Sequence, residues 1–523
     1  MSRTPAEDIA FALTRLIPLP QREPGLDAAT VAAILTEAER FAAEVLAPHA
    51  QEADRIGARL ENGRVRTPYA APYAAWRAGG WQSLPAPPEH GGQGLPFALW
   101  CGVLELCSAA DMAFMLCPLL TAGAIEAIAR HASPDQRARW LPPLIAAEWT
   151  GTMCLTEPQA GSDLSDLRTR AEPLGDGRYA LHGQKIYITY GDHDLTENCL
   201  HLVLARLPDA PAGTRGISLF AAPRLLPDGR ANALRAAGLE RKLGIHASPT
   251  CVMLFEGAVA ELIGEPHRGL SAMFAMMNNA RLAVGIQGVG QGARALALAE
   301  AYAAQRIQGG RPIARHPDVA RMLAEMRAIT TAMRFLALEA AASPPVRLAL
   351  LTPIVKAWCT DRGVEVAHLG LQVHGGLGYI EDAGAAQVLR DARIAPIYEG
   401  TNGIQALDLV QRKLRGDGGV AMLSLLEQEV APTDPLLAAA AARLAEAARR
   451  LLTAPAEEAA AGATPFLEAA GWVLGGWMLA RAAALDAAYA PMAAFYLRRL
   501  LPRADAALIQ VKEAEVLLAW MAS

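Results

Sequence analysis

The stretch MCLTEPQAGSD, Met153–Asp163, leaves a predicted β-strand and turns at Pro158 and Gly161. It places two hydroxyl groups and several backbone N–H groups at the end of the strand. Such groups suit the edge of a flat ring system and a pyrophosphate. A capped turn explains the same residues equally well, because Ser and Asp commonly follow Gly in turns. Spacing alone leaves both interpretations open.

The chain on the N-terminal side of this stretch is predicted to be α-helical up to about Glu148. Apolar residues recur at helical spacing from Val31 to Leu46, and Asp27 is placed to cap that helix. Two more helical patterns run from about Phe97 to Ser108 and from Pro118 to Arg130.

The sequence changes character near Trp149, where short runs of β-branched and aromatic residues are separated by Gly, Pro and Asp. We therefore expect a β-domain of about a hundred residues. The predicted strands are Thr150–Leu155, Tyr179–Leu181, Lys185–Thr189, His201–Arg206, Gly216–Phe220 and Thr250–Phe255.

Long helical patterns return from Gly269 to Arg415, and the turn Gly416–Gly419 marks a further boundary. The predicted domains are therefore residues 1–149, 150–265, 266–415 and 416–523. In the last of these, Ala-rich helices are expected near Pro435–Leu452, Pro465–Ala490 and Ala504–Trp520, with a flexible connector at Thr453–Thr464.

Composition agrees with a mostly helical protein. Of the 523 residues, 52% are hydrophobic, with alanine supplying much of this share, and only 6% are aromatic, which favours close-packed helices over a β-sandwich. The net charge of −5 is small, and no basic run with interleaved aromatic residues is present. Nucleic acid is therefore not an expected partner.

The seven cysteines are expected to be reduced core thiols, because none forms a CxxC pair or lies beside a histidine at metal-ligand spacing. We expect no metal site. Met1–Ala10 has no apolar signal core, and no later stretch of about 18 residues lacks polar interruptions. We therefore expect a cytoplasmic protein without a transmembrane segment.

Two further segments carry candidate chemistry. Gln372–Tyr379 has closely spaced glycines that let a backbone approach a phosphate, although a tight helix turn explains them too. It is followed by Arg390–Arg393. Pro396–Gln405 contains Glu399 at a predicted helix boundary, where a glutamate is most often a solvated cap.

Taken in order, these segments resemble the signatures of the acyl-CoA dehydrogenase family, and the resemblance runs from about Leu26 to Arg415. It implies an α+β fold that is mostly α, with an N-terminal helical domain, a central β-domain and a C-terminal four-helix bundle. The tail after Gly416 forms an extra helical region. Thr150–Cys154 and Lys242–Met253 are similar to the long, 3-methylmercaptopropionyl-CoA dehydrogenase-like branch.

The resemblance implies FAD as cofactor and an acyl-CoA substrate. In the family, the first segment contacts the flavin, the strand Gly183–Thr189 runs along it, and the Gln and Gly residues of the second segment reach the neighbouring subunit's FAD. Tyr187 stands where the family often has Trp. The implied cofactor-binding residues are Cys154, Leu155, Thr156, Ser162, Tyr187, Ile188, Thr189, Arg306, Gln372, Gly375, Gly376 and Thr401.

The resemblance also makes Glu399 the base that removes the α proton of the thioester. Some branches carry this base directly before an arginine that matches Arg281, but here that residue is Ala280. Besides Glu399, the implied substrate-binding residues are Ser162, Arg281, Tyr398 and Gly400.

The implied partners are an electron-transferring flavoprotein and further copies of the chain, as a dimer or a dimer of dimers. Two other functions remain open on this fold. One is an acyl-CoA oxidase or flavin monooxygenase, in which oxygen meets the reduced flavin, and the retained Glu399 argues against the monooxygenase. The other is a non-catalytic assembly protein. The sequence does not determine the acyl chain.

Overall fold

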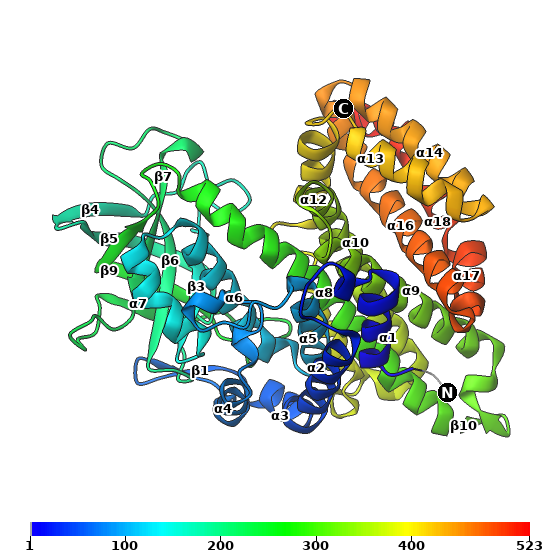
Figure 1. Cartoon of the computed structure of the whole chain (residues 1–523), viewed down its shortest axis with the longest axis horizontal. Coiled ribbons are helices and arrows are strands. Elements are labelled where there is room, and N and C mark those ends of the chain that lie inside the picture. The colour runs from blue at the N-terminus through cyan, green and yellow to red at the C-terminus, as the bar shows by residue number, and fades with distance from the viewer. Residues whose placement is uncertain (1–2) are drawn as a thin grey trace. The chain divides into compact units, whose positions relative to one another are not determined.

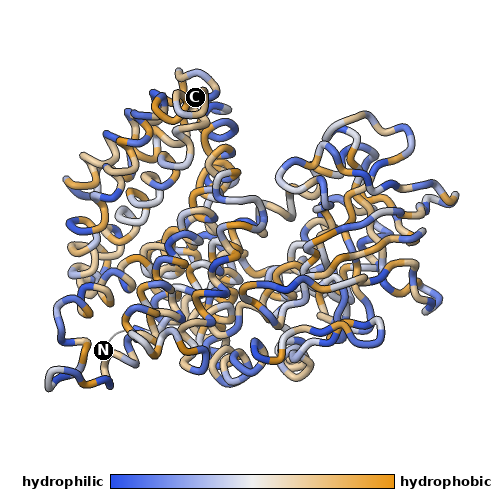
Figure 2. Tube along the Cα trace, turned by 180° about the vertical axis from the view of Figure 1, so that it is seen from behind, coloured by the Kyte–Doolittle hydropathy of each residue, from blue (hydrophilic) through white to orange (hydrophobic). Residues whose placement is uncertain are grey.

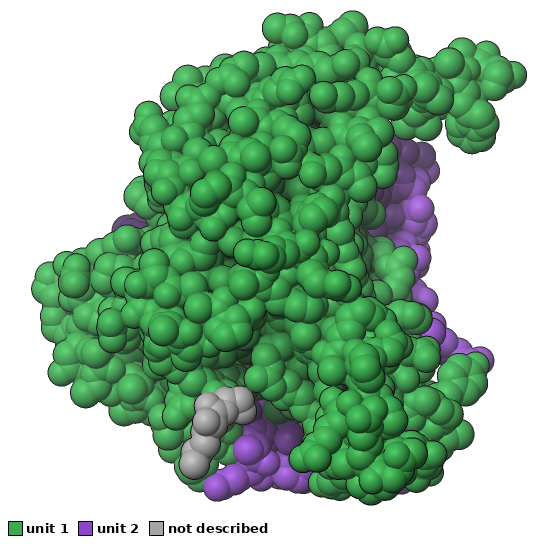
Figure 3. Space-filling model, turned by 90° about the vertical axis from the view of Figure 1, so that its right-hand side faces the viewer, with its two compact units in different colours: residues 1–41, 97–110, 281–523 green, residues 42–96, 111–280 purple. Residues whose placement is uncertain are grey.

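The computed structural model describes residues 3–523, apart from the side chains of Ala275, Met276 and Asn278. Figure 1 labels the helices and strands, and Figure 3 colours the two compact units of the chain: residues 1–41, 97–110 and 281–523 make up unit 1, and residues 42–96 and 111–280 make up unit 2. Each unit draws on several predicted domains, so the division into four consecutive domains stays a prediction.

Unit 2 contains a seven-stranded sheet in the order β3-β6-β4-β5-β9-β7, with β8 paired to β9. β3 and β6 run parallel, and an antiparallel pairing of β6 with β7 closes part of the path into a ring. Buried apolar side chains such as Leu181, Phe220 and Phe255 form its core. The strands are β3 (Trp149–Cys154), β4 (Arg170–Gly175), β5 (Arg178–Thr189), β6 (Asn198–Arg206), β7 (Ile217–Pro223), β8 (Leu234–Leu239) and β9 (Thr250–Ile263).

The predicted β-domain is confirmed, but its strands differ in detail. The two strands expected between Tyr179 and Thr189 are one strand, β5, whose pairing with β9 shifts register twice. Gly183 lies at the interruption with φ of 155°, and a methyl group there would lie 2.4 Å from the hydroxyl oxygen of Thr169. The interruption at Gly183 therefore marks a β-bulge within one strand and not a turn between two strands. β4 and β8 were not predicted.

The expectation of an entirely helical chain up to Glu148 is wrong at one place. β1 (Arg59–Glu61) and β2 (Arg64–Arg66) form an antiparallel hairpin. Asn62 and Gly63 both have positive φ, which is the conformation that a two-residue hairpin turn requires. The remaining long elements of this part of unit 2 are α3 (Ala47–Ile56), α4 (Ala70–Ala78), α6 (Met112–His131) and α7 (Pro134–Ile145).

Helix α6 packs directly on β3. A methyl group at Gly151 would lie 2.4 Å from the Cβ of Ala124, and Gly151 N donates to the hydroxyl of Thr121 at 3.1 Å. Among the described residues α6 is the one helix long and apolar enough to cross a membrane, yet 83% of the relevant window is buried inside the protein. A core helix of a soluble protein has the same properties.

Unit 1 is helical. Its N-terminal helices include α1 (Pro5–Phe11), α2 (Ala28–Phe41) and α5 (Phe97–Ala110), and Asp27 accepts a hydrogen bond from Thr30 N at 2.7 Å at the start of α2, as predicted. Its longest helices are α8 (Gly269–Gln305, from residue 281), α9 (Pro317–Ala341) and α10 (Pro345–His374).

Helices α8 and α10 touch backbone to backbone. A methyl group at Gly288 would lie 2.6 Å from the carbonyl oxygen of Cys359, and one at Gly363 would lie 2.5 Å from the carbonyl oxygen of Gly288. Such close approach leaves no room for side chains at these glycines. The two helices therefore form a rigid pair.

The C-terminal region packs on this helical pair. Hydrophobic positions recur along its helices (Figure 2), and α16 lies against α9, α10 and α12 (Asn402–Leu407). The predicted connector Thr453–Thr464 contains a short helix, α15, which the prediction missed. The main helices are α13 (Val420–Ser424), α14 (Pro435–Thr453), α15 (Ala456–Ala461), α16 (Ala463–Leu485), α17 (Ala490–Phe495), α18 (Arg503–Lys512) and α19 (Ala514–Met521).

The two ends of unit 1 are joined by polar contacts. The Arg3 guanidinium donates to the hydroxyl of Tyr489 at 2.7 Å, and this hydroxyl donates to Asp8 at 2.7 Å. Asp8 pairs with the buried Arg334 at 3.3 Å, which also pairs with the buried Glu105 at 2.6 Å. A chain of polar groups thus connects the first helix, the bundle and the C-terminal region.

Gly471→Ala is expected to destabilise unit 1. A methyl group there would lie 2.2 Å from Cγ of Trp358, a buried indole on α10. Overpacking of this kind costs about 1–3 kcal/mol, which exceeds the gain of about 1 kcal/mol in helix propensity from Gly to Ala. The midpoint of thermal unfolding should therefore fall.

Gly476→Ala on the same helix is the matched control, because its nearest neighbours are side-chain atoms 3.2–3.3 Å away. It should leave the midpoint close to that of the wild type. Equal midpoints for both variants would contradict the tight contact at Gly471.

Candidate active site

The predicted base lies in a tight turn of unit 1. The turn follows α11 (Ala385–Ala392) and leads into α12. Glu399 and Gly400 both have left-handed backbones, with φ of 55° and 84°. Thr401 then caps α12 by accepting a backbone hydrogen bond on its hydroxyl. A left-handed glutamate is uncommon, and strained residues of this kind gather at functional sites.

Burial raises the pKa of Glu399 above the usual value, although the positive charges of Arg281 and Lys356 act in the opposite direction. Arg281 lies close to the turn, because its Nε donates to the carbonyl oxygen of Glu399 at 3.4 Å. A carboxylate with a raised pKa is a stronger proton acceptor near neutral pH. The electrostatics of the turn therefore suit a general base.

Tyr398 is held by the same helix, α8, that carries Arg281. Its hydroxyl donates to Oε1 of Gln287, a fully buried residue of α8. The hydroxyl is thus engaged inside the helical unit, so a substrate contact would use the ring. The role of Tyr398 in substrate binding stays a prediction, as do those of Arg281 and Gly400.

Sequence analysis missed two residues that hold this turn. The buried ammonium of Lys356 on α10 donates to the carbonyl oxygen of Gly400 at 2.8 Å and to Oδ1 of Asn402 at 2.9 Å. Lys356 is the one charged residue in the apolar run Leu348–Cys359. A lone charge in such a run indicates a buried, paired group, and that signal was available in the sequence.

The first predicted cofactor segment lies in unit 2, where β3 ends. Ile186 N donates to the carbonyl oxygen of Thr156 at 2.9 Å, which joins the turn to β5. Beneath it lies a buried ion pair that sequence analysis did not single out: Lys185 Nζ is 2.8 Å from Glu157 and 2.9 Å from the carbonyl oxygen of Leu155. The pair fixes the turn against the strand, while Ser162 beyond it is exposed.

The strand residues predicted to lie along the flavin point in different directions. The side chain of Tyr187 is 60% exposed, and its φ of 60° turns the backbone at this point. Thr189 is partly exposed. By contrast, the side chains of Cys154 and Ile188 are buried in the core, so these residues can offer only backbone groups. An exposed aromatic ring beside partly exposed hydroxyls fits the flat ring of FAD.

The remaining predicted cofactor residues gather at one end of the α8–α10 pair. Tyr302 on α8 stacks on His374 on α10 with ring centroids 4.7 Å apart, which brings the two helix ends together. Arg306 follows α8, and Gln372 lies in the last turn of α10; both are exposed. Gly375 and Gly376 follow, and nothing lies within 4 Å of a methyl group placed on either. Exposed cationic and backbone groups of this kind suit a dinucleotide.

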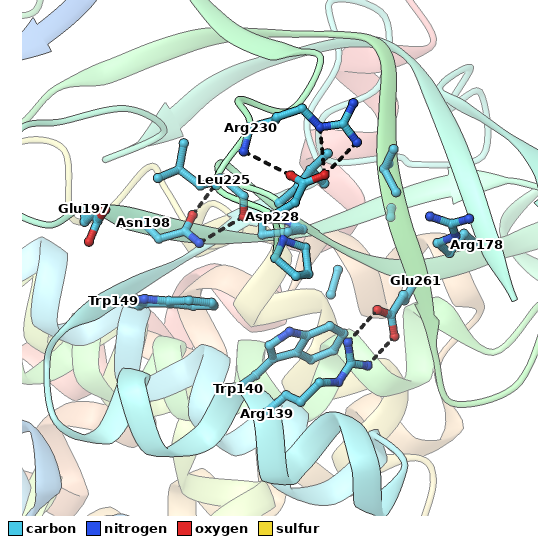
Figure 4. Close-up of a pocket in the computed structure, with 17 residues that line it drawn as sticks. Arg139, Trp140, Trp149, Arg178, Glu197, Asn198, Leu225, Asp228, Arg230 and Glu261 are labelled. Carbon is cyan, nitrogen blue, oxygen red and sulfur yellow. Dashed lines mark hydrogen bonds and ion pairs between the residues drawn. The ribbon is translucent and has the colours of Figure 1, made fainter. Parts of the chain in front are cut away.

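A cavity of about 710 Å³ lies elsewhere in unit 2, between α7 and the loop Pro223–Arg230 (Figure 4). Its polar side chains are largely paired with one another. Arg139 contacts Glu261 at 2.7 Å, and Asp228 contacts Arg230 at 2.6 Å. No predicted site residue lines it, so we assign it no role.

All seven cysteines are buried, which confirms their predicted place in the core: Cys101, Cys107, Cys117, Cys154, Cys199, Cys251 and Cys359. Burial raises the pKa of each thiol. Within the described part of the chain, no three His, Cys, Asp or Glu side chains are grouped to hold a metal ion.

Four family models match the chain in order. They are the N-terminal domain of acyl-CoA dehydrogenase at residues 29–148, its middle domain at 152–258, its C-terminal domain at 267–414, and the acetyl-CoA dehydrogenase C-terminal like domain at 420–521.

Similar proteins cover nearly the whole chain. The 3-methylmercaptopropionyl-CoA dehydrogenase of Ruegeria pomeroyi is 45% identical over 91% of this chain and 90% of its own. An acyl-CoA dehydrogenase from Bacillus anthracis, solved with FAD, has the same fold, with a TM-score of 0.78 at 19% identity over 95% of this chain and 91% of its own.

A third similar structure is described as the electron transferring flavoprotein of Acidaminococcus fermentans. It has a TM-score of 0.65 and 27% identity, and the match covers 75% of this chain and 99% of that one. Together with the family models, these similarities show that the chain belongs to the acyl-CoA dehydrogenase family of FAD-binding flavoenzymes, and specifically to its long, 3-methylmercaptopropionyl-CoA dehydrogenase-like branch.

Proposed function

We propose that the enzyme converts an acyl-CoA thioester to the trans-2-enoyl-CoA, with Glu399 as the base that removes the α proton. The observation that carries this proposal is the left-handed turn at Glu399, where burial raises the pKa of the carboxyl. A desolvated carboxylate in a fixed position is what proton abstraction next to a carbonyl requires.

The residues around Glu399 support the same step. Burial raises the pKa of Glu399, and the positive charges of Arg281 and Lys356 beside the carboxylate limit that rise. Backbone N–H groups that bind the thioester carbonyl would stabilise the developing enolate. FAD, when bound, would supply the two-electron acceptor for the β hydride at its N5.

The cofactor assignment rests on two groups of residues. The proposed contacts in unit 2 come from Cys154, Leu155, Thr156, Ser162, Tyr187, Ile188 and Thr189, and those in unit 1 come from Thr401, Arg306, Gln372, Gly375 and Gly376. Gln372 lies sixteen residues after Lys356 on α10. At a rise of about 1.5 Å per residue, Gln372 therefore lies about 24 Å along α10 from Lys356, which binds the turn that contains Glu399.

That separation supports the proposal that Arg306, Gln372 and the glycines bind the FAD of a neighbouring copy. The enzyme would then be a dimer or a dimer of dimers. We further propose a cytoplasmic location and reoxidation by an electron-transferring flavoprotein.

An anaerobic screen of acyl-CoA thioesters tests the function. The set should include 3-methylmercaptopropionyl-CoA and butyryl-CoA, and bleaching of the flavin absorbance by at least one thioester is the expected result. Lack of bleaching by every thioester would favour a non-catalytic role. Release of hydrogen peroxide in air during turnover would instead identify an oxidase.

The pH dependence of flavin reduction should have an acid limb above the usual glutamate value of 4.5. Glu399 accepts a proton only when ionised, and burial raises its pKa, so the rate should rise as the pH increases through that raised pKa and level off above it. Stopped-flow reduction between about pH 4 and 9 measures the profile. An acid limb below pH 4.5 would contradict the assigned environment.

A further inference from the structure

The buried lysine of α10 binds two groups of the base-bearing turn. Lys356 Nζ donates to the carbonyl oxygen of Gly400 and to Oδ1 of Asn402. Asn402 in turn donates from Nδ2 to the carbonyl oxygen of Ala357 at 3.1 Å and to Asp361 at 2.8 Å. The turn and one stretch of α10 are therefore joined by hydrogen bonds in both directions.

The lysine is positioned by packing on both sides of its helix. A methyl group at Gly285 of α8 would lie 2.6 Å from Cγ1 of Val355, the residue before Lys356. Trp358, two residues after it, lies against Gly471 of α16. Because both contacts are close, α10 has little freedom to shift, and the ammonium is a fixed point.

The turn needs such a fixed point. Glu399 has a left-handed backbone that a glutamate does not adopt by preference, and Gly400 continues in the same region. Lys356 binds the peptide carbonyl that immediately follows Glu399, so it restrains the backbone that orients the carboxylate. A desolvated ammonium is retained in such a place only with acceptors around it.

We infer that Lys356 is a positioning residue for the base: its ammonium, with Asn402, holds the strained turn and so directs the carboxylate of Glu399 to the α carbon of the substrate. This inference rests on the proposed role of Glu399. The same ammonium acts on the charge of the base. It faces Glu399, Arg281 from α8 and Asp361 from its own helix. Its positive charge lowers the pKa of Glu399, and burial lowers its own pKa to about 7, so this charge is present on the acid side of that value.

Lys356→Met removes the charge and the donors but keeps the length of the side chain. Flavin reduction at saturating substrate should fall about tenfold or more, as expected for a misplaced catalytic group. The acid limb of its pH profile should move to higher pH, because one of the two positive charges that lower the pKa of Glu399 is lost. Binding of a product analogue and FAD content should stay within about twofold of wild type.

Lys512→Met is the matched control, because this lysine is exposed and pairs only loosely with Glu446 at 3.4 Å. It should behave as wild type. Asn402→Ala is the second variant of the network and keeps Lys356 in place. It should also lower the reduction rate, and the double variant should lose less than the product of the two single effects, because both act through one turn.

A folded Lys356→Met enzyme with wild-type rate and pH profile would overturn the inference. So would equal losses of rate, FAD and product-analogue binding, which indicate general damage. If Lys356→Met does not fold, a wild-type rate for Asn402→Ala would overturn it. Glu399→Gln, measured alongside, separates the two claims: an active Glu399→Gln enzyme refutes the proposed function itself, whereas an inactive one with normal Lys356→Met refutes only the role of the lysine.

Discussion

Glu399→Gln is expected to lower the rate of flavin reduction by a good acyl-CoA substrate by at least about 100-fold, the usual contribution of a positioned general base. Glutamine keeps the size and hydrogen-bonding capacity of the side chain but does not accept the α proton. FAD content and binding of an acyl-CoA product analogue should remain near wild type, because neither needs the proton transfer. Anaerobic stopped-flow spectroscopy measures the rate.

Glu265→Gln provides the control, since this glutamate is an exposed carboxylate far along the chain from the turn. Its reduction rate should match that of the wild type. If Glu399→Gln reduced its flavin within about threefold of the wild-type rate, well short of a general-base effect, the base would lie elsewhere, although the fold would stand.

Glu157→Ala is expected to destabilise unit 2 by about 3–5 kcal/mol, because it leaves the fully buried ammonium of Lys185 without its counter-charge. The lost carboxylate also accepts hydrogen bonds from Arg168 N at 2.7 Å and Thr169 N at 3.0 Å. Since these bonds anchor the turn that begins at Thr156, the variant should also lose FAD more readily. Denaturant unfolding and flavin absorbance measure the two effects.

The loss of stability in Glu157→Ala should depend on pH. Burial alone would raise the pKa of Glu157, but the charge of Lys185 and the hydrogen bonds hold it at about 2. A depressed pKa contributes stability above the unfolded value of 4.5 that is lost as the pH falls towards 2. The difference between wild type and Glu157→Ala should therefore narrow on acidification through this range.

Two further variants test whether loss of the buried Glu157–Lys185 pair causes the destabilisation. Glu172→Ala breaks an exposed pair with Arg170 on β4 and should leave unfolding unchanged. The double variant Glu157→Gln with Lys185→Met should recover much of the stability, because it removes both charges. If Glu157→Ala unfolded like wild type, the buried pair would not hold the turn.

The fold was predictable because its signals are local. The apolar periodicity of Val31–Leu46 and the alternation of helical and β-rich segments appear in any short window of sequence. The Asn62–Gly63 hairpin was also visible as a turn signal, but the helical surroundings obscured it. The continuous strand β5 was divided because Gly183 looks like a turn, whereas cross-strand pairing carries the chain through it.

The candidate site was predictable only as a set of motifs. Lys356 lies more than forty residues before Gly400 and Asn402 along the chain, so its contact with them depends on how α10 packs against the turn. Likewise, the two motifs that contain Cys154 and Ile188 do not reveal that these side chains face the core. Side-chain direction follows from strand register, which is a property of the assembled sheet.

The polar chain from Arg3 through Tyr489 and Asp8 to Arg334 has a consequence for biosynthesis. Unit 1 combines residues from both ends of the chain, whereas unit 2 is complete by about residue 280. During translation, unit 2 can therefore fold while the ribosome is still adding the bundle. The first helices pack against parts of unit 1 that are synthesised hundreds of residues later. Until those parts emerge, the apolar faces that they will cover are accessible to chaperones.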